Sequence, residues 1–377
     1  MSAGGGSATF RIGQARDPDW RKAAANCLAQ IGAPDGQANI GWLYFSDHFA
    51  DVTEAILEAF RKATHIEDWF GCAAIGVCAT GHEYFDQPAI VALVGRLPEG
   101  SYRFFASAEG GVDGFVQRED GWLSQQLGCF GVVHGDPGDG GALAAMPQLA
   151  EACEGFFVGG ITASRGRHPQ IAGRIHEGGL TAMLLSGEVG VATGLTQGCS
   201  PIGTAHEVTA AEGNVLFELD GRPALEVFKQ DIGEVLARDL RRVSGYIFAA
   251  LPVRGADWGD YLVRNLTGID EQHGALAIGD DLSEAGQIMF CRRDRGTAQA
   301  DMRRMLTDLT GRLDGPPRAA LYHTCLARGA NMFEAENAEL GLIAEHLGDI
   351  PLVGFFGNGE ISHNRLYAYT GVLSVFT

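Results

Sequence analysis

Residues 351–361 read PLVGFFGNGEI, an apolar strand-like run that passes directly into a glycine-rich polar turn. The same order recurs mid-chain, where the apolar run 180–185 precedes a glycine-rich segment ending in LTQGCSPIG (195–203). Glycines at a strand end allow close approach of the backbone and leave amide groups free to face a ligand. Neither segment spells a phosphate loop, a zinc site or a nucleophile elbow. The two segments therefore predict a pocket more clearly than a reaction.

Composition places the chain among ordinary globular proteins. Its 377 residues suffice for two domains, with 46% of them apolar and 20% charged. Glycine is frequent, at 54 residues, but follows no fixed period, which excludes a collagen-like protein. The net charge of −19 argues against nucleic acid and anionic membranes as partners, because both attract basic patches.

The cysteines and the absence of targeting signals predict a cytoplasmic protein. No run approaches the ~18 apolar residues of a membrane-spanning helix. The first residues lack the charged and apolar regions of a secretory signal. The eight cysteines are scattered and contain no Cys-x-x-Cys pair, which predicts free thiols rather than a disulfide framework.

Apolar periodicity predicts strands that alternate with helices and also run in hairpin groups, a pattern typical of mixed β-sheets covered by helices. The expected strands are 38–45, 69–74, 89–97, 102–107, 127–134, 155–161, 178–186, 188–195, 214–219, 246–253, 261–266, 275–278, 287–291, 319–326, 352–356 and 366–376. The expected helices are 19–31, 51–65, 142–153, 223–242, 297–313 and 334–347, with Thr297 as an N-cap. The predicted fold class is α/β, of the mixed α+β kind.

A module boundary is expected at Asp220-Gly221, a turn signal followed by Pro223, which suits the first turn of a helix. This divides the chain into 1–35, a loose tail (1–17) with a leading helix; 36–220, an N-terminal module; and 221–377, a C-terminal module.

The order of several motifs resembles that of the FIST family, whose paired N- and C-terminal modules are described as small-ligand sensory domains. The motifs that carry the resemblance are GCAA (71–74), FVGG (157–160), LTQGCSPIG (195–203), LDGRPA (219–224), YLVRN (261–265), GFFGNGEI (354–361) and YTGVL (369–373). The resemblance implies a sensory protein in signal transduction whose ligand is an amino acid or related metabolite. No effector segment is recognisable in the chain, so we expect it to report to a separate signalling protein.

A pocket between the modules is expected to take residues from both glycine-rich segments. Backbone N–H groups would hold an anionic ligand end, Glu360 a cationic end, and Gln197 offers both a donor and an acceptor. Arg264 would either clamp an anion or pair with Asp220, Glu218 or Asp270. The candidate ligand-binding residues are Cys72, Gly159, Gly160, Gln197, Gly198, Cys199, Ser200, Arg264, Asn358, Gly359 and Glu360. Each also has a purely structural interpretation, as a bend, a turn or a core residue.

Three alternatives stay open at this point. The first is a haem-binding nitric oxide sensor, which the resemblance suggests because one bacterial branch of the family is reported to bind haem. It would need an axial ligand such as His206 or His363. The second is an enzyme whose reactive group is Cys72, Cys199 or Glu360, with Cys72 expected at an exposed strand end. The third is an interaction scaffold. The 11 histidines show no zinc-binding spacing, and no residue is assigned a catalytic role.

Overall fold

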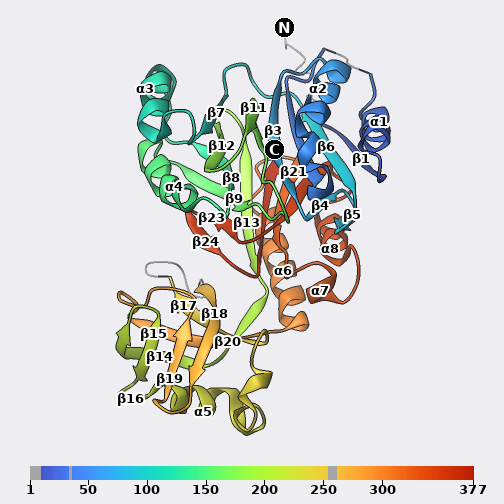
Figure 1. Ribbon diagram of the computed structural model, residues 1–377. Helices are drawn as coiled ribbons and strands as arrows, with labels where there is room; N and C mark the ends of the chain where they lie inside the picture. Colours follow the sequence, from blue (N-terminus) through green and yellow to red (C-terminus); the bar gives the residue numbers. More distant parts are fainter. Residues whose placement is uncertain (1–9, 34–35, 254–260) are drawn as a thin grey trace. The chain divides into compact units, whose positions relative to one another are not determined.

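The computed structural model describes residues 10–33, 36–253 and 261–377, and it confirms a mixed α+β fold with helices that cover β-sheets (Figure 1). The chain forms two compact units. Unit 1 contains residues up to Thr196, then Met302–Leu366 and Thr370–Thr377, and unit 2 contains Gln197–Asp301 and Tyr367–Tyr369. These units follow contacts in space, whereas the predicted modules follow chain order, so the boundary at residue 220 stays a prediction.

Unit 1 consists of three repeats with one order of elements: an edge strand, two parallel strands each preceded by a helix, a hairpin and a return strand. The first repeat comprises β1 (Arg11–Arg16), α1 (Trp20–Ile31), β2 (Ile40–Ser46), η1 (Asp47–Val52), α2 (Thr53–Thr64), β3 (Asp68–Ala74), β4 (Gly76–Ala79), β5 (His82–Phe85) and β6 (Ala89–Gly95). The second comprises β7 (Tyr102–Ala106), α3 (Gly111–Leu123), β8 (Phe130–Gly135), α4 (Gly140–Ala152), β9 (Phe156–Ile161), β10 (Gln170–Ala172), β11 (Arg174–His176) and β12 (Leu180–Leu185). The third comprises β13 (Val191–Gln197), α6 (Arg295–Thr310), β21 (Ala319–Cys325), α7 (Ala330–Phe333), α8 (Ala338–Leu347), β22 (Leu352–Gly357), β23 (Glu360–Ser362), β24 (Arg365–Tyr367) and β25 (Thr370–Phe376).

Each repeat gives its hairpin to the sheet of another repeat. The three sheets have the orders β1-β6-β2-β3-β10-β11, β7-β12-β8-β9-β23-β24 and β13-β25-β21-β22-β4-β5. Hairpin β4–β5 thus joins the third repeat, β10–β11 joins the first, and β23–β24 joins the second. The exchange closes a cycle, so every sheet needs strands from two repeats.

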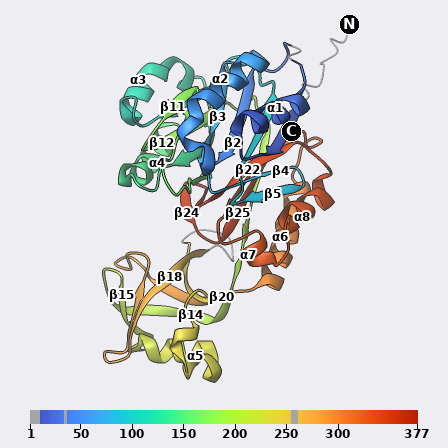
Figure 2. The same ribbon diagram turned by 45° about the vertical axis from the view of Figure 1, so that its right-hand side comes forward.

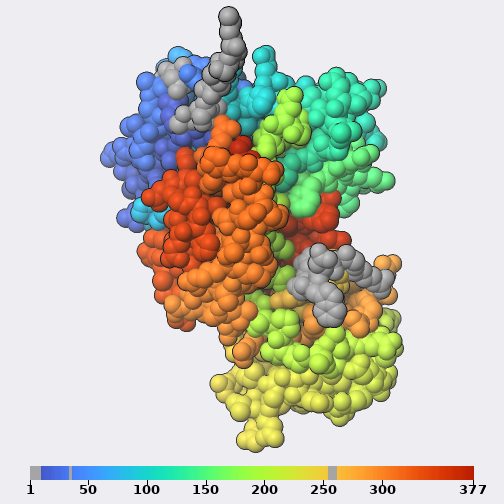
Figure 3. All heavy atoms as spheres, turned by 180° about the vertical axis from the view of Figure 1, so that it is seen from behind, coloured from blue at the N-terminus to red at the C-terminus, as the bar shows by residue number. Residues whose placement is uncertain are grey.

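The inner faces of the three sheets share one apolar core, and the outer faces are covered by helices. Successive strand residues point to opposite faces, so Trp42 and Tyr44 lie in the central core while Leu43 packs with α1 and α2. In the second repeat Val132 points inward and Val133 packs under α3 and α4. Figure 2 shows the helix groups on different sides of the sheets, and in Figure 3 the blue, green and orange-red repeats lie side by side.

Unit 2 is a β-barrel covered by a helix. Its strands are β14 (Cys199–Glu212), β15 (Val215–Leu219), β16 (Arg222–Pro223), β17 (Ile247–Pro252), β18 (Tyr261–Asp270), β19 (Ala275–Ile278) and β20 (Gln287–Arg293), with α5 (Ala224–Ala237) and η2 (Leu240–Arg242). Strand β14 pairs with β20 at one edge and with β15 at the other, which closes the sheet on itself. Phe228 of α5 stacks edge-to-face on Phe290 of β20, their ring centroids 4.8 Å apart, and thereby fixes the helix over the apolar interior.

The structure corrects three local expectations. Residues 11–16, expected in a loose tail, form β1 and pair with β6; residues 1–9 of that tail lie outside the described residues. Helix α3 is absent from the prediction because glycines inside it each disfavour a helix by about 1 kcal/mol, and burial of Phe115 and Trp122 outweighs this. Helix α6 starts at Arg295, and Asp294 rather than Thr297 caps it, since the Asp294 carboxylate accepts the Thr297 N–H at 2.8 Å.

Candidate functional site

The glycine-rich turn after β22 and the middle of β9 lie together in unit 1, which brings five of the predicted site residues into one place. Strand β23 pairs antiparallel with β9, so Glu360 lies opposite Gly160 and Ile361 opposite Gly159. The Asn358 N–H donates to Ile161 O at 2.8 Å, and the Ile161 N–H donates to Gly359 O at 2.9 Å. The turn is therefore fixed by backbone bonds on both sides.

Glycine is required at the centre of this pairing. Gly159 has φ 139°, and a Cβ atom there would lie 2.0 Å from Val133 O on the neighbouring strand β8. Gly359 has φ 116°, which side chains rarely allow. The glycines seen in the sequence thus serve close strand packing and turn geometry.

Glu360 carries a carboxylate oxygen with no partner in a fully buried position. Its Oε2 accepts from the Thr370 backbone N–H at 3.2 Å and from Thr370 Oγ1 at 2.7 Å. Nothing among the described residues hydrogen-bonds Oε1. Burial raises the pKa of Glu360 to about 8, and the Thr370 hydrogen bonds offset this only in part. At neutral pH the carboxyl is therefore largely protonated.

The nearby cation Arg328 is engaged by another carboxylate. Arg328 Nε donates to Glu339 Oε1 at 2.7 Å, and both side chains are fully buried. Glu339 also accepts from the Tyr322 hydroxyl at 2.8 Å and from Thr324 Oγ1 at 3.2 Å. Because Arg328 is neutralised locally, it lowers the pKa of Glu360 less than burial raises it.

The repeats explain why the Glu360 oxygen lacks a partner. Gln170 occupies the equivalent hairpin position, and its amide is satisfied: Thr181 Oγ1 donates to Gln170 Oε1 at 2.7 Å, and Gln170 Nε2 donates to Gly179 O at 3.3 Å. Thr181 of β12 pairs in register with His134 of β8. In the third repeat, Val372 of β25 pairs in register with His323 of β21, so Val372 is the counterpart of Thr181. An apolar side chain therefore stands where the second repeat supplies a hydroxyl.

Tyr44, His134 and His323 are functional candidates that the sequence analysis did not single out. Each is the fifth residue of the equivalent strand β2, β8 or β21. Tyr44 Oη lies 3.3 Å from His134 Nε2, and the two histidine ring centroids lie 6.0 Å apart. Neither ring nitrogen of His323 has a partner in the described part of the chain. The recurrence of this strand position in all three repeats is the signal that points to the cluster.

Burial makes these histidines poor bases. It lowers the pKa of His323 to about 3, and burial together with the neighbouring His323 also lowers the pKa of His134. Both rings are therefore neutral across the physiological range.

The other glycine-rich segment passes from unit 1 into unit 2 at Gln197, and its residues from Gln197 on are held by neighbours in unit 2. The Gln197 backbone N–H donates to Asp301 Oδ2 at 2.7 Å, and Gln197 Nε2 donates to Tyr261 O at 3.4 Å. Next along the chain come Gly198, Cys199 and Ser200. The Cys199 carbonyl accepts from the Tyr261 hydroxyl at 2.5 Å, and Ser200 is half-buried.

Arg264 pairs with a carboxylate that the sequence analysis did not name. Its Nε donates to Asp280 Oδ2 at 2.6 Å. The expected pocket formed by both glycine-rich segments stays a prediction.

The cysteines do not provide exposed thiolates. Cys72, expected at an exposed strand end, is fully buried in β3 beside Tyr44, and burial raises its pKa well above the usual range. All eight cysteines are buried and unpaired by disulfides. The expectation of an exposed Cys72 is wrong because β3 is an interior strand, flanked by β2 and β10.

The two histidines considered as haem ligands occupy different surroundings. His206 has a carboxylate at each ring nitrogen, Asp220 at 2.6 Å and Asp231 at 2.9 Å, so binding iron would require displacing one of them. His363 is exposed in the β23–β24 turn and stacks on Phe156 with a centroid separation of 4.9 Å. Within residues 10–33, 36–253 and 261–377, no group of three His, Cys, Asp or Glu side chains has the geometry of a metal site.

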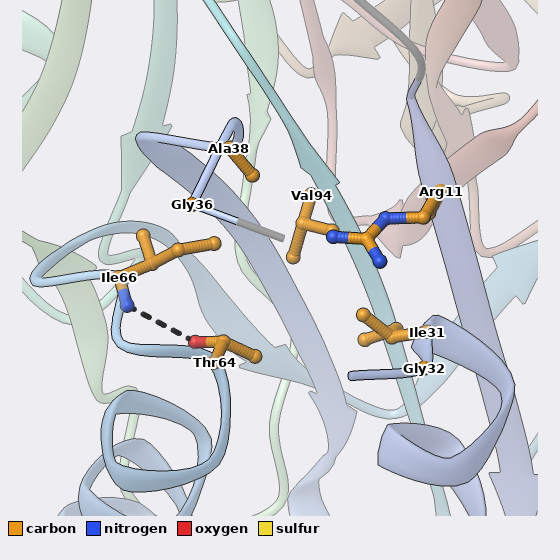
Figure 4. Close-up of a pocket in the computed structure, with 8 residues that line it drawn as sticks. All are labelled: Arg11, Ile31, Gly32, Gly36, Ala38, Thr64, Ile66 and Val94. Carbon is orange, nitrogen blue, oxygen red and sulfur yellow. Dashed lines mark hydrogen bonds between the residues drawn. The ribbon is translucent and has the colours of Figure 1, made fainter. Parts of the chain in front are cut away.

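The pocket shown in Figure 4 is too small for a metabolite. Its volume is about 10 Å³, near the minimum for one water molecule. It lies between α1, α2 and strand β6, and the Arg11 side chain extends into it toward Val94 and Ile31. The Ile66 N–H donates to Thr64 Oγ1 at 3.3 Å beside it.

Comparison with known proteins identifies the family. The FIST N domain model matches residues 39–222, and the FIST C domain model matches residues 224–363. The chain belongs to the FIST family. FIST domains are associated with small-ligand binding in signal transduction.

Curated relatives of this FIST protein match it along nearly their whole length. Uncharacterized protein Rv0628c of Mycobacterium tuberculosis H37Rv is 30% identical over 393 residues, covering 97% of this chain and 98% of the relative. Uncharacterized protein Mb0898c of Mycobacterium bovis is 28% identical over 392 residues, with the same coverage. None of the helices in the described part of the FIST chain has the length and apolar character needed to cross a bilayer.

Proposed function

We propose that this FIST protein binds a small amino-acid-like metabolite through Glu360 in unit 1 and reports its presence to a separate signalling protein in the cytoplasm. The observation that carries the proposal is the buried, unpartnered Oε1 of Glu360 beside Gly160. Leaving such an atom unpaired costs about 1–3 kcal/mol. A ligand amine or hydroxyl that donates to Oε1 recovers this energy, and Glu360 then gives up its proton on binding.

Binding at Glu360 requires a local opening, because the side chain has no exposed surface in this conformation. A ligand that binds only the open form shifts the population toward it, and that differential affinity is what a partner protein would detect. Glu360 is the first residue of β23. Soon after it the chain passes from unit 1 into residues 367–369 of unit 2 and returns to unit 1 at β25. This position in the chain supports the proposed role.

The experiment is a thermal-shift and native mass spectrometry screen of the purified protein against the standard amino acids and small amines. We expect at least one compound to raise Tm and to appear as added mass. Glu360→Gln should weaken its binding at least tenfold, which corresponds to about 1.4 kcal/mol. Glu83→Gln is the matched control, because Glu83 is another carboxyl with a buried, unpartnered oxygen and a pKa raised by burial, to about 7.

Equal binding by wild type and Glu360→Gln would contradict the assignment of Glu360, and no binding by any compound would contradict the metabolite class. A visible absorption spectrum of the same sample tests the haem alternative, since a Soret band would redirect attention to histidine ligands. Uniformly slow alkylation of all eight thiols is expected from their burial and would exclude a thiol-based enzyme.

A further inference from the structure

His206 in unit 2 bridges two carboxylates from different elements. Its Nδ1 lies 2.6 Å from Asp220 Oδ2 in the turn between β15 and β16, and its Nε2 lies 2.9 Å from Asp231 Oδ2 on α5. The side chains of His206 and Asp231 are 11% and 10% exposed, whereas that of Asp220 is 47% exposed. The imidazole thus joins β14, the turn and the helix at one point.

Only a doubly protonated ring satisfies both carboxylates. A neutral imidazole has one N–H, so one carboxylate would then face a ring nitrogen that cannot donate. Partial burial lowers the pKa of His206, but the hydrogen bonds and charges of Asp220 and Asp231 outweigh this and raise it. The same bond lowers the pKa of Asp220, with a smaller contribution from the charge of Arg222.

The backbone around His206 is shaped to allow this contact. Strand β14 has a register shift between Ile202 and His206, and Gly203 in that bulge has φ 69°. A Cβ atom at Gly203 would lie 2.6 Å from the Asp231 carboxylate, so a larger residue there would displace that carboxylate from its present position. On the other side, Asp220 Oδ1 accepts the Glu207 N–H at 2.8 Å, which fixes the second carboxylate to the same strand.

Helix α5 is interrupted directly after this contact. Gly233, two residues beyond Asp231, has the non-helical angles φ 77° and ψ 163°. The bond from His206 to Asp231 therefore holds the end of the first half of α5, and the chain beyond Gly233 continues in a new direction.

We propose that His206, Asp220 and Asp231 form a protonation-dependent latch, which fastens α5 and the β15–β16 turn to the bulge of β14 while the imidazole carries both protons. The charged groups that face the ring are Asp220 and Asp231, with Arg222 next to Asp220 but paired with Glu226. Because the folded protein favours the imidazolium, the latch is complete below the ordinary histidine pKa and weakens as pH rises through the raised value. This inference is independent of the ligand site proposed in unit 1.

The first test is an NMR titration of the His206 ring proton in the full-length protein. We expect an apparent pKa above about 6.5, the ordinary value. Asp231→Asn and Asp220→Asn should each bring the value down, because each removes one negative charge beside the ring. A wild-type pKa at or below the ordinary value, or one that neither variant changes, would overturn the proposal.

The second test is amide hydrogen exchange in α5 at pH 6 and pH 8.5, corrected for the intrinsic pH dependence of exchange. Wild-type protection at residues 224–232 should fall about tenfold at the higher pH, and His206→Gln should show low protection at both. His273→Gln is the control, since His273 pairs with the single carboxylate of Asp270 on the surface and should leave α5 unchanged.

If His206→Gln does not fold, Asp231→Asn provides the same comparison, because it removes the negative charge through which the ring holds α5. Equal protection of α5 at both pH values in the wild-type protein would contradict the latch, whatever the variants show.

Discussion

Hairpins β10–β11 and β23–β24 occupy equivalent places in two sheets of unit 1, yet the buried polar side chain that each carries is hydrogen-bonded differently. Gln170 in the first finds a hydroxyl and a carbonyl for its amide, while Glu360 in the second finds partners for one oxygen only. Two positions differ: Thr181 has Val372 as its counterpart, and Gly179, whose carbonyl accepts from Gln170, has Thr370, which donates to Glu360. The two repeats thus have the same backbone arrangement, but the buried polar side chain is a structural contact in one and a candidate binding group in the other.

The pH dependence of stability should show the largest effect. In the native protein Glu360 has a pKa of about 8, whereas in the unfolded chain its carboxyl has the ordinary pKa of a glutamate. Between these two pKa values the folded state therefore binds one more proton than the unfolded state. Stability contributed by this group therefore falls as pH rises from about 5 to 8, on the order of 3 kcal/mol. Urea denaturation of Glu83→Gln and of Glu83→Gln/Glu360→Gln at several pH values should show that the second substitution flattens the slope. An unchanged slope would mean that Glu360 titrates normally.

Removing the satisfied contact should have the next largest effect. Gln170→Met keeps the side-chain volume but removes the acceptor of Thr181 Oγ1 and one of the two donors to Gly179 O, which keeps the Asp136 N–H at 2.9 Å. We expect the free energy of unfolding to fall by about 2–3 kcal/mol, measured by urea denaturation at pH 7. A loss below about 0.5 kcal/mol would show that this amide contributes little and would weaken the comparison.

Supplying the missing hydroxyl should have the smallest effect on stability, but it tests the comparison between the two repeats most directly. Val372→Thr places a donor where Thr181 stands in the second repeat, so it should lower the pKa of Glu360 and add about 1 kcal/mol at pH 8. It should also weaken ligand binding, because the ligand then competes for an occupied oxygen. Val91→Thr is the control: it is the equivalent position of the first repeat, whose hairpin residue is the apolar Val77. Stabilisation by both variants would show that the hydroxyl does not act through Glu360.

Local sequence patterns predicted much of the fold. Strands such as β2 and β22 and helices such as α1 and α2 follow from apolar runs and amphipathic spacing, and the mixed α+β class follows from their order. The prediction failed where local preference is weak. Strand β1 is short, and α3 contains three glycines, so both depend on tertiary packing for their conformation.

The sequence also indicated part of the candidate site. The glycine-rich turn placed Asn358, Gly359 and Glu360 after a buried strand, and Gly159 and Gly160 within another, and the structure pairs these two segments. It gave no sign of His323, because a single histidine in an apolar strand looks like any core residue until its neighbours are known. It also misjudged Cys72, since the order of strands in a sheet, and hence which strand is interior, is a long-range property.

By itself, then, the sequence determined the family, the class of fold and the glycines that shape the strand ends, because periodicity, turn chemistry and motif order are local properties. Only the tertiary structure decided that three repeats exchange their hairpins in a cycle, that one oxygen of Glu360 is buried without a partner, and that His206 joins two carboxylates. These features depend on which residues, far apart in the chain, are brought within hydrogen-bonding distance. In a buried environment that choice of neighbours sets both the energy of a polar group and its protonation.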